Sequence, residues 1–348
     1  MVFMNTFNTN IPHLRYNPLR GEYILVCANR LQRPWQGGNE KPSEKSAQCY
    51  DKDCYMCPGN TRANGKINPQ YTDIFVFNND YPALLSENEE NIINEPEWKN
   101  AITVKGFCRV LCYTSLHNTT MGEMDINSIK LVIDAWENQI KELHNYSFIK
   151  YVQIFENRGG VGNSNPHPHC QVWATDFIPN EIDKETINQK KYYKKNNKCL
   201  LCNVVADELK QKERIVYENA SWLIYLPFWA VWPFETMILP KKHINTLETL
   251  DGETKLQLAE IFKLLITTYD NLFNVIMPLS FGLHYSPKIC IEGTYWHVHF
   301  HFNPLLLRSS TVRKFMAGFE MFATPQRDIT PETAAELLRQ TLHKAKSS

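Results

Sequence analysis

The 348-residue chain repeats one pattern twice, and this repeat limits its possible folds more than any other feature. The pattern is a Cys-x-x-Cys pair, an apolar run followed by a histidine, a helical segment, a second apolar run and a string of alternating histidines. The string is NSNPHPHCQVW at residues 163–173 in the first copy and WHVHFH at residues 296–301 in the second. Self-similarity on this scale predicts a duplicated unit whose two copies pack together.

Each copy contains one segment with helical periodicity. Apolar side chains recur every three or four positions over residues 125–146 and again over residues 252–273, which is typical of an amphipathic helix. Short apolar runs at residues 151–155 and 280–285 predict a strand directly after each helix. In the histidine strings every second residue lies on one face if the segment is a strand, so His167, His169 and Gln171 are expected to share a face.

A further apolar strand precedes each helix. We expect the first to end in His117 and the second in His243. Strands that alternate with single helices in this way predict an α+β fold, with two sheets or one fused sheet and helices packed on it.

The boundary between the copies falls in a polar, lysine-rich stretch. We therefore expect an N-terminal half at residues 1–179, a connector at 180–198 and a C-terminal half at 199–348. Apolar residues make up 43% of the chain and charged residues 21%, a globular composition.

The charge balance excludes several functional classes. With 37 basic and 37 acidic residues the formal net charge is zero, so no net field attracts nucleic acid or an anionic membrane. No window has the roughly 18 apolar residues of a membrane helix, and the N-terminus does not resemble a secretory signal. These features predict a cytoplasmic protein, in which the ten cysteines are thiols or metal ligands rather than disulfides.

The two Cys-x-x-Cys pairs predict metal sites. Zinc prefers four tetrahedral thiolate and imidazole ligands, and two cysteines in one tight turn can face the same ion. By the symmetry of the repeat, the candidate zinc sites are Cys54, Cys57, His117 and His167, and Cys199, Cys202, His243 and His297. The alternative is a pair of ordinary buried thiols. A redox role is the weaker hypothesis, because neither pair is expected at the start of a helix in a βαβ unit.

His169 is then left as a candidate nucleophile. A neutral imidazole can attack phosphorus and form a phosphoramidate, which passes the phosphoryl group to a second acceptor. Gln171 could donate its amide to a non-bridging oxygen, and the glycines of residues 159–162 could let backbone N–H groups surround a phosphate. The alternative is that His169 only satisfies a backbone carbonyl.

The string SNPHPHCQ, from Ser164 to Gln171, resembles the active-site signature of the galactose-1-phosphate uridylyltransferases, a family of the histidine-triad superfamily. Other segments resemble further blocks of that family in the same order: residues 33–37, 76–80, 155–157, 233–236, 269–273 and 306–316. The similarity extends over nearly the whole chain. It implies a histidine-triad-like unit in each half and a mainly antiparallel sheet.

The resemblance also implies a reaction. Members exchange a uridylyl group between UDP-glucose and galactose 1-phosphate by a ping-pong mechanism, which yields UDP-galactose and glucose 1-phosphate in galactose metabolism. His169 would carry UMP between the two half-reactions. Gln171 and Ser164 would hold the transferred phosphoryl group, with Asn157 and Gly162 beside it.

Further substrate contacts follow from the resemblance. The residues expected to bind uridine are Phe77, Asn79 and Asp80, and those expected to contact the hexose are Lys314, Glu320 and Gln326. Arg30 and Arg33 would reach the phosphates in the site of a partner subunit, which implies a homodimer with shared active sites.

The family likeness supports the first zinc site and adds a third metal site. The ligands of the latter, for iron or zinc, would be Glu185, His284, His299 and His301. The second cysteine pair and His297 depart from the best-known members, so we predict zinc in both halves from the repeat. Asn163 stands where relatives often have cysteine, and the loop at residues 157–162 is one residue shorter.

Two other functions compete with this one. A nucleotidyl phosphorylase acting on an ADP-sugar would use the same scaffold, but the segment from Thr311 to Gln326 follows the uridylyltransferase pattern. A zinc-stabilised RNA-binding protein without catalysis is disfavoured by the zero net charge and by the intact His-x-His-x-Gln string.

Overall fold

The computed structural model describes residues 11–30, 48–88, 92, 93, 96, 98–159, 165–288, 290, 293–305 and 318–347. The helices in these residues are α1 (Ile126–His144), α2 (Asn180–Asn196), α3 (Leu200–Gln211), α4 (Gly252–Phe273), α5 (Phe319–Phe322) and α6 (Pro331–Ser347), with 3₁₀ turns at Ala28–Arg30 and Leu247–Thr249. The strands of the N-terminal half are β1 (His13–Asn17), β2 (Glu22–Val26), β3 (Phe75–Asn78), β4 (Ile92–Ile93), β5 (Ala101–Ile102), β6 (Gly106–Cys112), β7 (Tyr151–Arg158) and β8 (His169–Thr175). The remaining strands are β9 (Ile215–Glu218), β10 (Trp222–Tyr225), β11 (Thr236–Pro240), β12 (Leu279–His284), β13 (His299–Pro304) and β14 (Gln326–Arg327).

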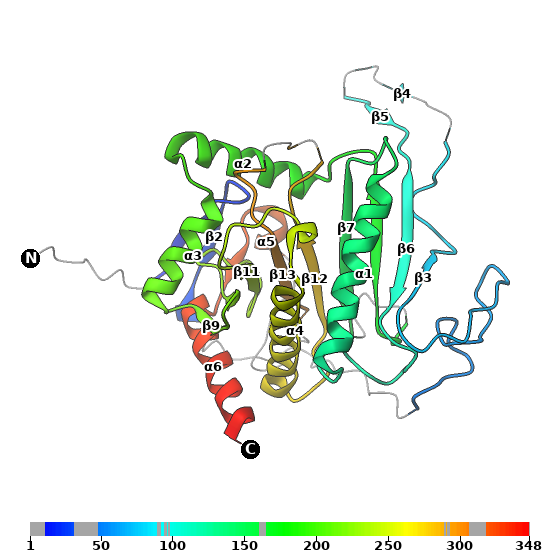
Figure 1. Ribbon diagram of the computed structural model, residues 1–348. Helices are drawn as coiled ribbons and strands as arrows, with labels where there is room; N and C mark the ends of the chain where they lie inside the picture. The colour runs from blue at the N-terminus through cyan, green and yellow to red at the C-terminus, as the bar shows by residue number, and fades with distance from the viewer. Residues whose placement is uncertain are drawn as a thin grey trace, which may run out of the picture.

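One continuous nine-stranded sheet contains strands from both halves (Figure 1). Its order is β3-β6-β8-β7-β12-β13-β11-β10-β9, and each neighbouring pair is antiparallel. The halves meet where β7 pairs with β12, from Leu279 opposite Arg158 to Leu283 opposite Ile154. The expectation of an α+β fold with a mainly antiparallel sheet is therefore confirmed, with one fused sheet rather than two.

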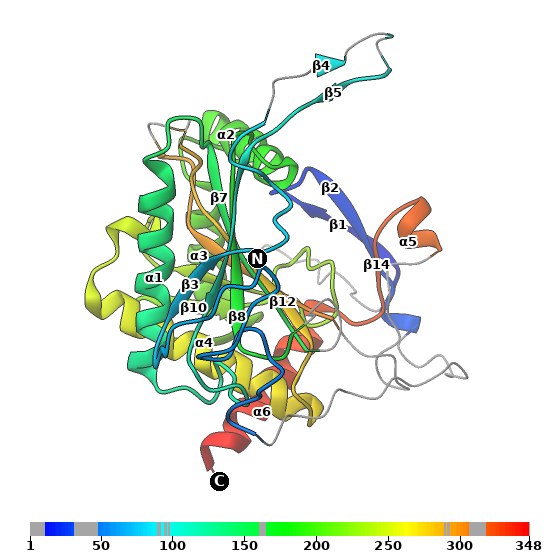
Figure 2. The same cartoon turned by 90° about the vertical axis from the view of Figure 1, so that its right-hand side faces the viewer.

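The two predicted helices cover one face of this sheet, as Figure 2 shows for α1 and α4. Each begins after an aspartate cap: Asp125 accepts a hydrogen bond from the Ser128 N–H at 3.0 Å, and Asp251 accepts one from the Thr254 N–H at 2.7 Å. Such caps satisfy backbone donors that the helix itself leaves unpaired. The apolar sides of both helices join the sheet in the main core, around Trp136.

The opposite face of the C-terminal half is covered by other elements. The strands β1, β2 and β14 form a small sheet on that side (Figure 2), with β14 parallel to β2. Ile24 of β2 and Leu19 of the β1–β2 turn pack with Leu223, Tyr225 and Met237 in a second core cluster.

The stretch expected as a connector, residues 180–198, is mostly helix α2. Its Glu185 and Gln189 side chains are buried, so this segment does more than join the halves. A polar helix of low hydrophobicity is tolerated here because its buried polar side faces the histidines of the sheet rather than an apolar core.

Three strand ends differ from expectation. β6 ends at Cys112 and β11 at Pro240, so His117 and His243 lie in the following turns instead of at strand ends. β8 begins at His169 rather than at His167, because Pro168 has no N–H to donate to a neighbouring strand. Among the described residues, no helix is both long and apolar enough to cross a membrane.

Candidate active site and metal-binding groups

His169 is the first residue of β8 and is 9% exposed. Its Nδ1 lies 2.7 Å from the carbonyl oxygen of His167. A carbonyl can only accept, so Nδ1 carries the hydrogen and Nε2 keeps its lone pair. Burial lowers the pKa of His169, which keeps the imidazole neutral at physiological pH. The backbone-carbonyl bond expected under the alternative hypothesis is therefore present, and it leaves the other nitrogen in the form that a nucleophile needs.

Gln171 follows two positions later on the same face of β8. Its Oε1 accepts a hydrogen bond from the Trp173 Nε1–H at 2.9 Å. This bond uses the acceptor end of the amide and leaves the NH₂ end able to donate. Trp173 in turn packs edge-on against Phe155, with ring centroids 5.5 Å apart. Sequence reasoning missed Trp173, although its i+2 position after Gln171 was visible.

Tyr113 and Glu156 are buried next to β8, and Tyr113 contacts the turn between His167 and His169. The Tyr113 N–H donates to the Pro168 carbonyl at 3.1 Å, and the Tyr113 hydroxyl donates to Glu156 Oε2 at 2.5 Å. Burial raises the pKa of Glu156 to about 7, although the Tyr113 hydrogen bond and Arg158 act to lower it. Neither Tyr113 nor Glu156 was predicted, because the contact joins segments far apart in the sequence.

The first predicted metal group is assembled: the ligand atoms of Cys54, Cys57, His117 and His167 lie within 4.8 Å of one another, and all four residues are buried. Cys57 Sγ is 3.6 Å from Nδ1 of both His117 and His167. Tetrahedral zinc with ordinary Zn–S and Zn–N lengths separates its ligand atoms by about 3.6 Å. The donor set fits a zinc ion.

The surroundings of this group also suit a cation. Burial raises the pKa of Cys57 to about 12, so a thiolate at this position needs a positive partner. His167 Nε2 is 2.9 Å from the Thr114 carbonyl oxygen and 3.2 Å from the Tyr71 hydroxyl. A bond from Nε2–H to that carbonyl leaves Nδ1 with its lone pair towards the cysteines. Tyr71 was not predicted from the sequence.

The second predicted group is also assembled, from Cys199, Cys202, His243 and His297. Cys202 Sγ is 3.2 Å from His243 Nδ1 and 3.3 Å from His297 Nδ1, while Cys199 Sγ is 4.0 Å from His297 Nδ1. His297 Nε2 lies 2.9 Å from the Pro240 carbonyl oxygen, as His167 does from Thr114. A hydrogen bond from Cys202 lowers the pKa of Cys199, which favours a thiolate.

The second pair lies at the start of a helix, but not in a βαβ unit, as expected. Cys199 is the N-cap residue of α3 and Cys202 lies in its first turn, so the pair does start a helix. The polar stretch before it concealed this helix start. Because α3 follows α2 rather than a strand, the pair still lacks the βαβ context of a redox motif.

The third group joins Glu185 of α2 to three histidines of β12 and β13. Glu185 Oε1 is 3.1 Å from His284 Nδ1 and 3.5 Å from His301 Nε2, and Glu185 Oε2 is 3.2 Å from His299 Nε2. His299 Nδ1 is 2.8 Å from the His297 carbonyl oxygen, which directs the Nε2 lone pair to Glu185.

The charges and buried atoms of the third group suit a bound cation. Buried Glu185 Oε2, His299 Nε2 and His301 Nε2 have no hydrogen-bond partner in the described structure. Burial lowers the pKa of His301 to about 4, so its imidazole is neutral. Burial opposes ionisation of Glu185, but the imidazoles of His284 and His299 hold its pKa well below the usual value. Converging lone pairs and one carboxylate fit a divalent metal ion.

The residues expected to bind uridine lie at the end of the edge strand β3. Phe77 is buried beside the first metal group, and the Arg62 guanidinium lies 4.5 Å from its ring centroid. Arg62 also forms an ion pair with Asp80 at 3.4 Å. Asn79 Oδ1 accepts from the Tyr81 N–H at 2.9 Å. Arg62 was missed because nothing local in its loop distinguishes it.

Other predicted substrate residues are spread over several elements. Asn157 is on β7, and its Oδ1 accepts from the Ser280 hydroxyl at 2.6 Å. Arg30 and Gln326 lie together beside β2 and β14, where each contacts Asp328. Glu320 is in the short helix α5. The predicted residues Ser164, Gly162, Arg33 and Lys314 lie outside the described residues.

The two repeated units each have a Cys₂His₂ group and a buried histidine at the start of a strand, His169 on β8 and His299 on β13. These features define a duplicated histidine-triad-like protein. The family description "Galactose-1-phosphate uridyl transferase, N-terminal domain" matches residues 3–179, and the corresponding C-terminal domain matches residues 185–348. The chain belongs to the galactose-1-phosphate uridylyltransferase family.

Individual relatives agree with this membership. The chain is 44% identical to the galactose-1-phosphate uridylyltransferase of Haemophilus influenzae over 332 residues, which cover 95% of each chain. It is also 44% identical to that of Rattus norvegicus, over 94% of this chain and 87% of the relative. A solved uridylyltransferase structure matches with a TM-score of 0.75 and 25% identity, over 95% of this chain and 99% of that one. An ADP-glucose phosphorylase from Arabidopsis thaliana shares the fold, with a TM-score of 0.75 and 23% identity over 94% of this chain and 99% of that one.

Proposed function

We propose that this chain transfers a uridylyl group between UDP-glucose and galactose 1-phosphate, through a covalent UMP adduct of His169. The observation that carries the proposal is the hydrogen bond from His169 Nδ1 to the His167 carbonyl at 2.7 Å, which presents a neutral imidazole with its Nε2 lone pair available. Membership of the family supports the choice of substrates.

The reaction has two balanced steps. His169 Nε2 attacks the α-phosphorus of UDP-glucose, an N–P bond forms, and the P–O bond to glucose 1-phosphate breaks. A phosphate oxygen of galactose 1-phosphate then attacks the same phosphorus, the N–P bond breaks, and UDP-galactose leaves with the imidazole restored. Each displacement inverts the phosphorus, so the configuration is retained over the cycle.

The residues around His169 would stabilise the charge that develops on the phosphoryl oxygens. Gln171 donates through its NH₂ group while Trp173 holds its oxygen. Asn157, with Ser164 and Gly162, is proposed to complete this phosphate environment. Phe77, Asn79 and Asp80 are proposed to bind uridine, with Arg62 fixing Asp80.

We also propose which metals the three groups hold. Both Cys₂His₂ groups have the donors and spacing of structural zinc sites, and the Glu185 group has the imidazole and carboxylate donors that suit iron or zinc. A structural ion in the first group would balance the charge of the thiolates and hold the turn before β8, while the chemistry stays with His169.

A homodimer in the cytoplasm is part of the proposal. Arg30 lies in the 3₁₀ turn after β2 and contacts Asp328, which follows β14. Together with Arg33 it would reach the phosphates in a partner's active site. Gln326 in β14, with Lys314 and Glu320, would contact the hexose. None of the ten cysteines, all in described residues, forms a disulfide, which suits a reducing compartment. Mixing a His169→Asn chain with an Arg30→Ala chain tests the shared site: a mixed dimer should regain activity that neither variant has alone.

The function is tested by incubating the protein with uracil-labelled UDP-glucose and no acceptor. Acid-labile label should stay on the protein, leave on addition of galactose 1-phosphate, and be absent from His169→Asn. Label that persists in that variant would refute the nucleophile. ADP-glucose as a competing donor should leave the labelling unchanged, whereas efficient competition would favour an ADP-sugar phosphorylase.

A further inference from the structure

A row of polar side chains crosses β8, β7 and β12. β8 and β7 pair with Gln171 opposite Phe155, and the same register continued by two residues places His169 opposite Asn157. β7 and β12 pair with Asn157 opposite Ser280. Residues that lie opposite one another in an antiparallel pair share a face of the sheet, with Cβ atoms about 4.5–5.5 Å apart. The row therefore runs from the proposed nucleophile in the N-terminal half to a serine of the C-terminal half.

The Ser280 hydroxyl donates a hydrogen bond to Asn157 Oδ1 at 2.6 Å. This bond occupies the oxygen of the Asn157 amide and leaves its NH₂ end able to donate. Gln171 has the same arrangement, because its Oε1 accepts from the Trp173 Nε1–H at 2.9 Å. Both amides of the proposed phosphate environment thus have their oxygen bound to a donor. The donor belongs to the N-terminal half for Gln171 and to the C-terminal half for Asn157.

The end of β7 is also attached to the C-terminal half by an ion pair. Next to Asn157, the buried Arg158 guanidinium pairs with Asp270 and donates through Nε to the Met277 carbonyl at 3.1 Å. Asp270 Oδ1 in turn accepts from the Met277 N–H at 2.8 Å. A buried ion pair resists separation, because breaking it leaves an uncompensated charge. The backbone at Asn157 is therefore fixed, and the Ser280 bond only has to set the rotation of the side-chain amide.

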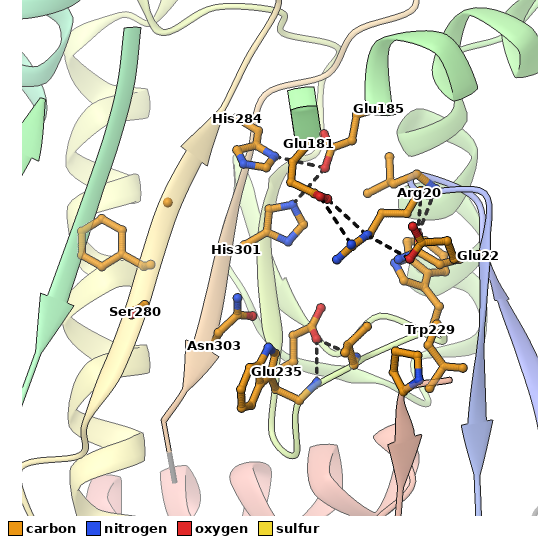
Figure 3. A pocket seen from close by; sticks show the side chains of 18 of the residues that line it. Arg20, Glu22, Glu181, Glu185, Trp229, Glu235, Ser280, His284, His301 and Asn303 are labelled. Carbon is orange, nitrogen blue, oxygen red and sulfur yellow. Dashed lines mark hydrogen bonds and ion pairs between the residues drawn. The ribbon is translucent and has the colours of Figure 1, made fainter. Parts of the chain in front are cut away.

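The surroundings of Ser280 do not require it for packing. Ser280 and Phe155 both line a cavity of about 530 Å³, and Figure 3 shows Ser280 next to Asn303 of the neighbouring strand β13 at the cavity wall. Phe155 packs against Trp173, so this wall belongs to the sheet face that carries the proposed active site. Removal of a hydroxyl that borders a cavity creates no new closed void in the core. The hydrogen bond to Asn157 is thus the contact that its loss would affect.

We propose that Ser280 is a positioning residue for uridylyl transfer, which holds the Asn157 amide so that its NH₂ group, and not its oxygen, faces the transferred phosphoryl group. An NH₂ group stabilises the negative charge that develops on the phosphoryl oxygens, whereas an amide oxygen in the same place would repel it. The C-terminal half thus contributes to the chemistry at His169 through one hydroxyl. This inference rests on the proposed transferase function.

Replacement of Ser280 should change kcat rather than KM. Ser280→Ala leaves the Asn157 amide without a fixed orientation, so kcat should fall about tenfold while the KM for UDP-glucose changes less than about twofold. Ser280→Cys keeps a weak donor of similar size and should lose less activity than the alanine variant. The matched control is Ser286→Ala, because the Ser286 hydroxyl, just beyond β12, has no hydrogen-bond partner in the described structure. An unchanged kcat in Ser280→Ala would overturn the proposal, as would an equal loss in the control.

A double-mutant cycle separates positioning from a general structural effect. Asn157→Ala removes the amide and should lower kcat by about 10²-fold, the loss typical of one donor to a developing oxyanion. In that background, Ser280→Ala should cost less than about twofold, because the hydroxyl no longer has an amide to orient. A serine that only supports the strand would cost the same in both backgrounds, and that result would contradict the proposal.

Labelling with uracil-labelled UDP-glucose distinguishes failure of this role from failure of the transferase function. In Ser280→Ala the initial rate of label transfer to the protein should fall about tenfold, while the final amount of label per chain stays the same, because His169 is intact. Labelling of Ser280→Ala at the unaltered rate would overturn the positioning role alone. An unaltered protein that takes up no label would overturn the transferase function and this role with it.

Discussion

The strings on β8 and β13 share one backbone arrangement and differ in their surroundings. In both, the first histidine lies next to a cysteine pair, and the second bonds through Nδ1 to the carbonyl of the first, at 2.7 Å for His169 and 2.8 Å for His299. The next position is Gln171 in one string and His301 in the other, and Glu185 lies 3.2 Å from His299 Nε2. The same strand geometry therefore serves different chemistry in the two copies. The difference comes from α2, which places the Glu185 carboxylate next to His299 in the second copy.

The largest expected effect distinguishes the two second histidines. His169→Asn should lower kcat by about 10⁴-fold or more, because a covalent nucleophile acts in both half-reactions. His299→Asn should lower it by less than about tenfold, since this residue belongs to the metal group. Steady-state kinetics with UDP-glucose and galactose 1-phosphate compare the two. Equal losses would mean that the halves do not differ in function as described.

The two cysteine pairs come next. Cys54→Ser with Cys57→Ser, and separately Cys199→Ser with Cys202→Ser, should each remove one metal ion per chain and lower the free energy of unfolding by about 3–5 kcal/mol, less than a full structural zinc site provides in peptides. Activity should fall more in the first variant, because His167 is two residues from His169. Metal analysis and denaturant unfolding are the measurements. An unchanged metal content in the second variant would contradict zinc in the C-terminal half.

A smaller effect is expected along β8 itself. Gln171→Ala should lower kcat by about 10²-fold, the loss typical of one donor to a developing oxyanion. Trp173→Phe removes only the bond that orients Gln171 and should cost about tenfold or less. If the second variant lost as much activity as the first, Trp173 would have a role of its own.

The last prediction concerns stability rather than activity, at the buried Glu156, whose equivalent on β12 is Leu283. Burial raises the pKa of Glu156 from 4.5 to about 7, so the folded state binds this proton more tightly than the unfolded state. The resulting stability is present below pH 4.5 and is lost as the pH rises to about 7, by about 3 kcal/mol at 1.36 kcal/mol per pKa unit. Glu156→Gln should remove this dependence from unfolding curves between those pH values. A variant with the same slope as the unaltered protein would exclude Glu156 as its source.

Local patterns predicted helices α1 and α4 and the two Cys₂His₂ groups. The helical periods at residues 125–146 and 252–273 are accompanied by aspartate caps, so α1 and α4 begin where expected. The two Cys₂His₂ sets followed from the repeat, because duplicated units place equivalent residues in equivalent positions. The third set came from resemblance alone, since Glu185 lies in a stretch of the sequence that looks like a linker.

Contacts between distant segments could not be predicted. Tyr71 reaches His167, Tyr113 reaches Glu156, and Arg62 reaches Asp80 only because the chain folds these segments together. The start of β8 differed from expectation for a local reason, because Pro168 has no N–H for the strand hydrogen bonds that the alternation suggested. Likewise, the helix start at Cys199 was concealed by the lysines before it.

The pairing of β7 with β12 has a consequence for how this chain is made. Each half exposes an unpaired strand along its full length until the other half is present, and such an edge is a template for pairing with any other exposed strand. The N-terminal half is synthesised first, so the edge of β7 that pairs with β12 stays unpaired until the C-terminal half has been made. Premature termination after residue 179 should give an aggregation-prone fragment rather than a working half-enzyme, even though the candidate nucleophile and the first metal group would be complete within it.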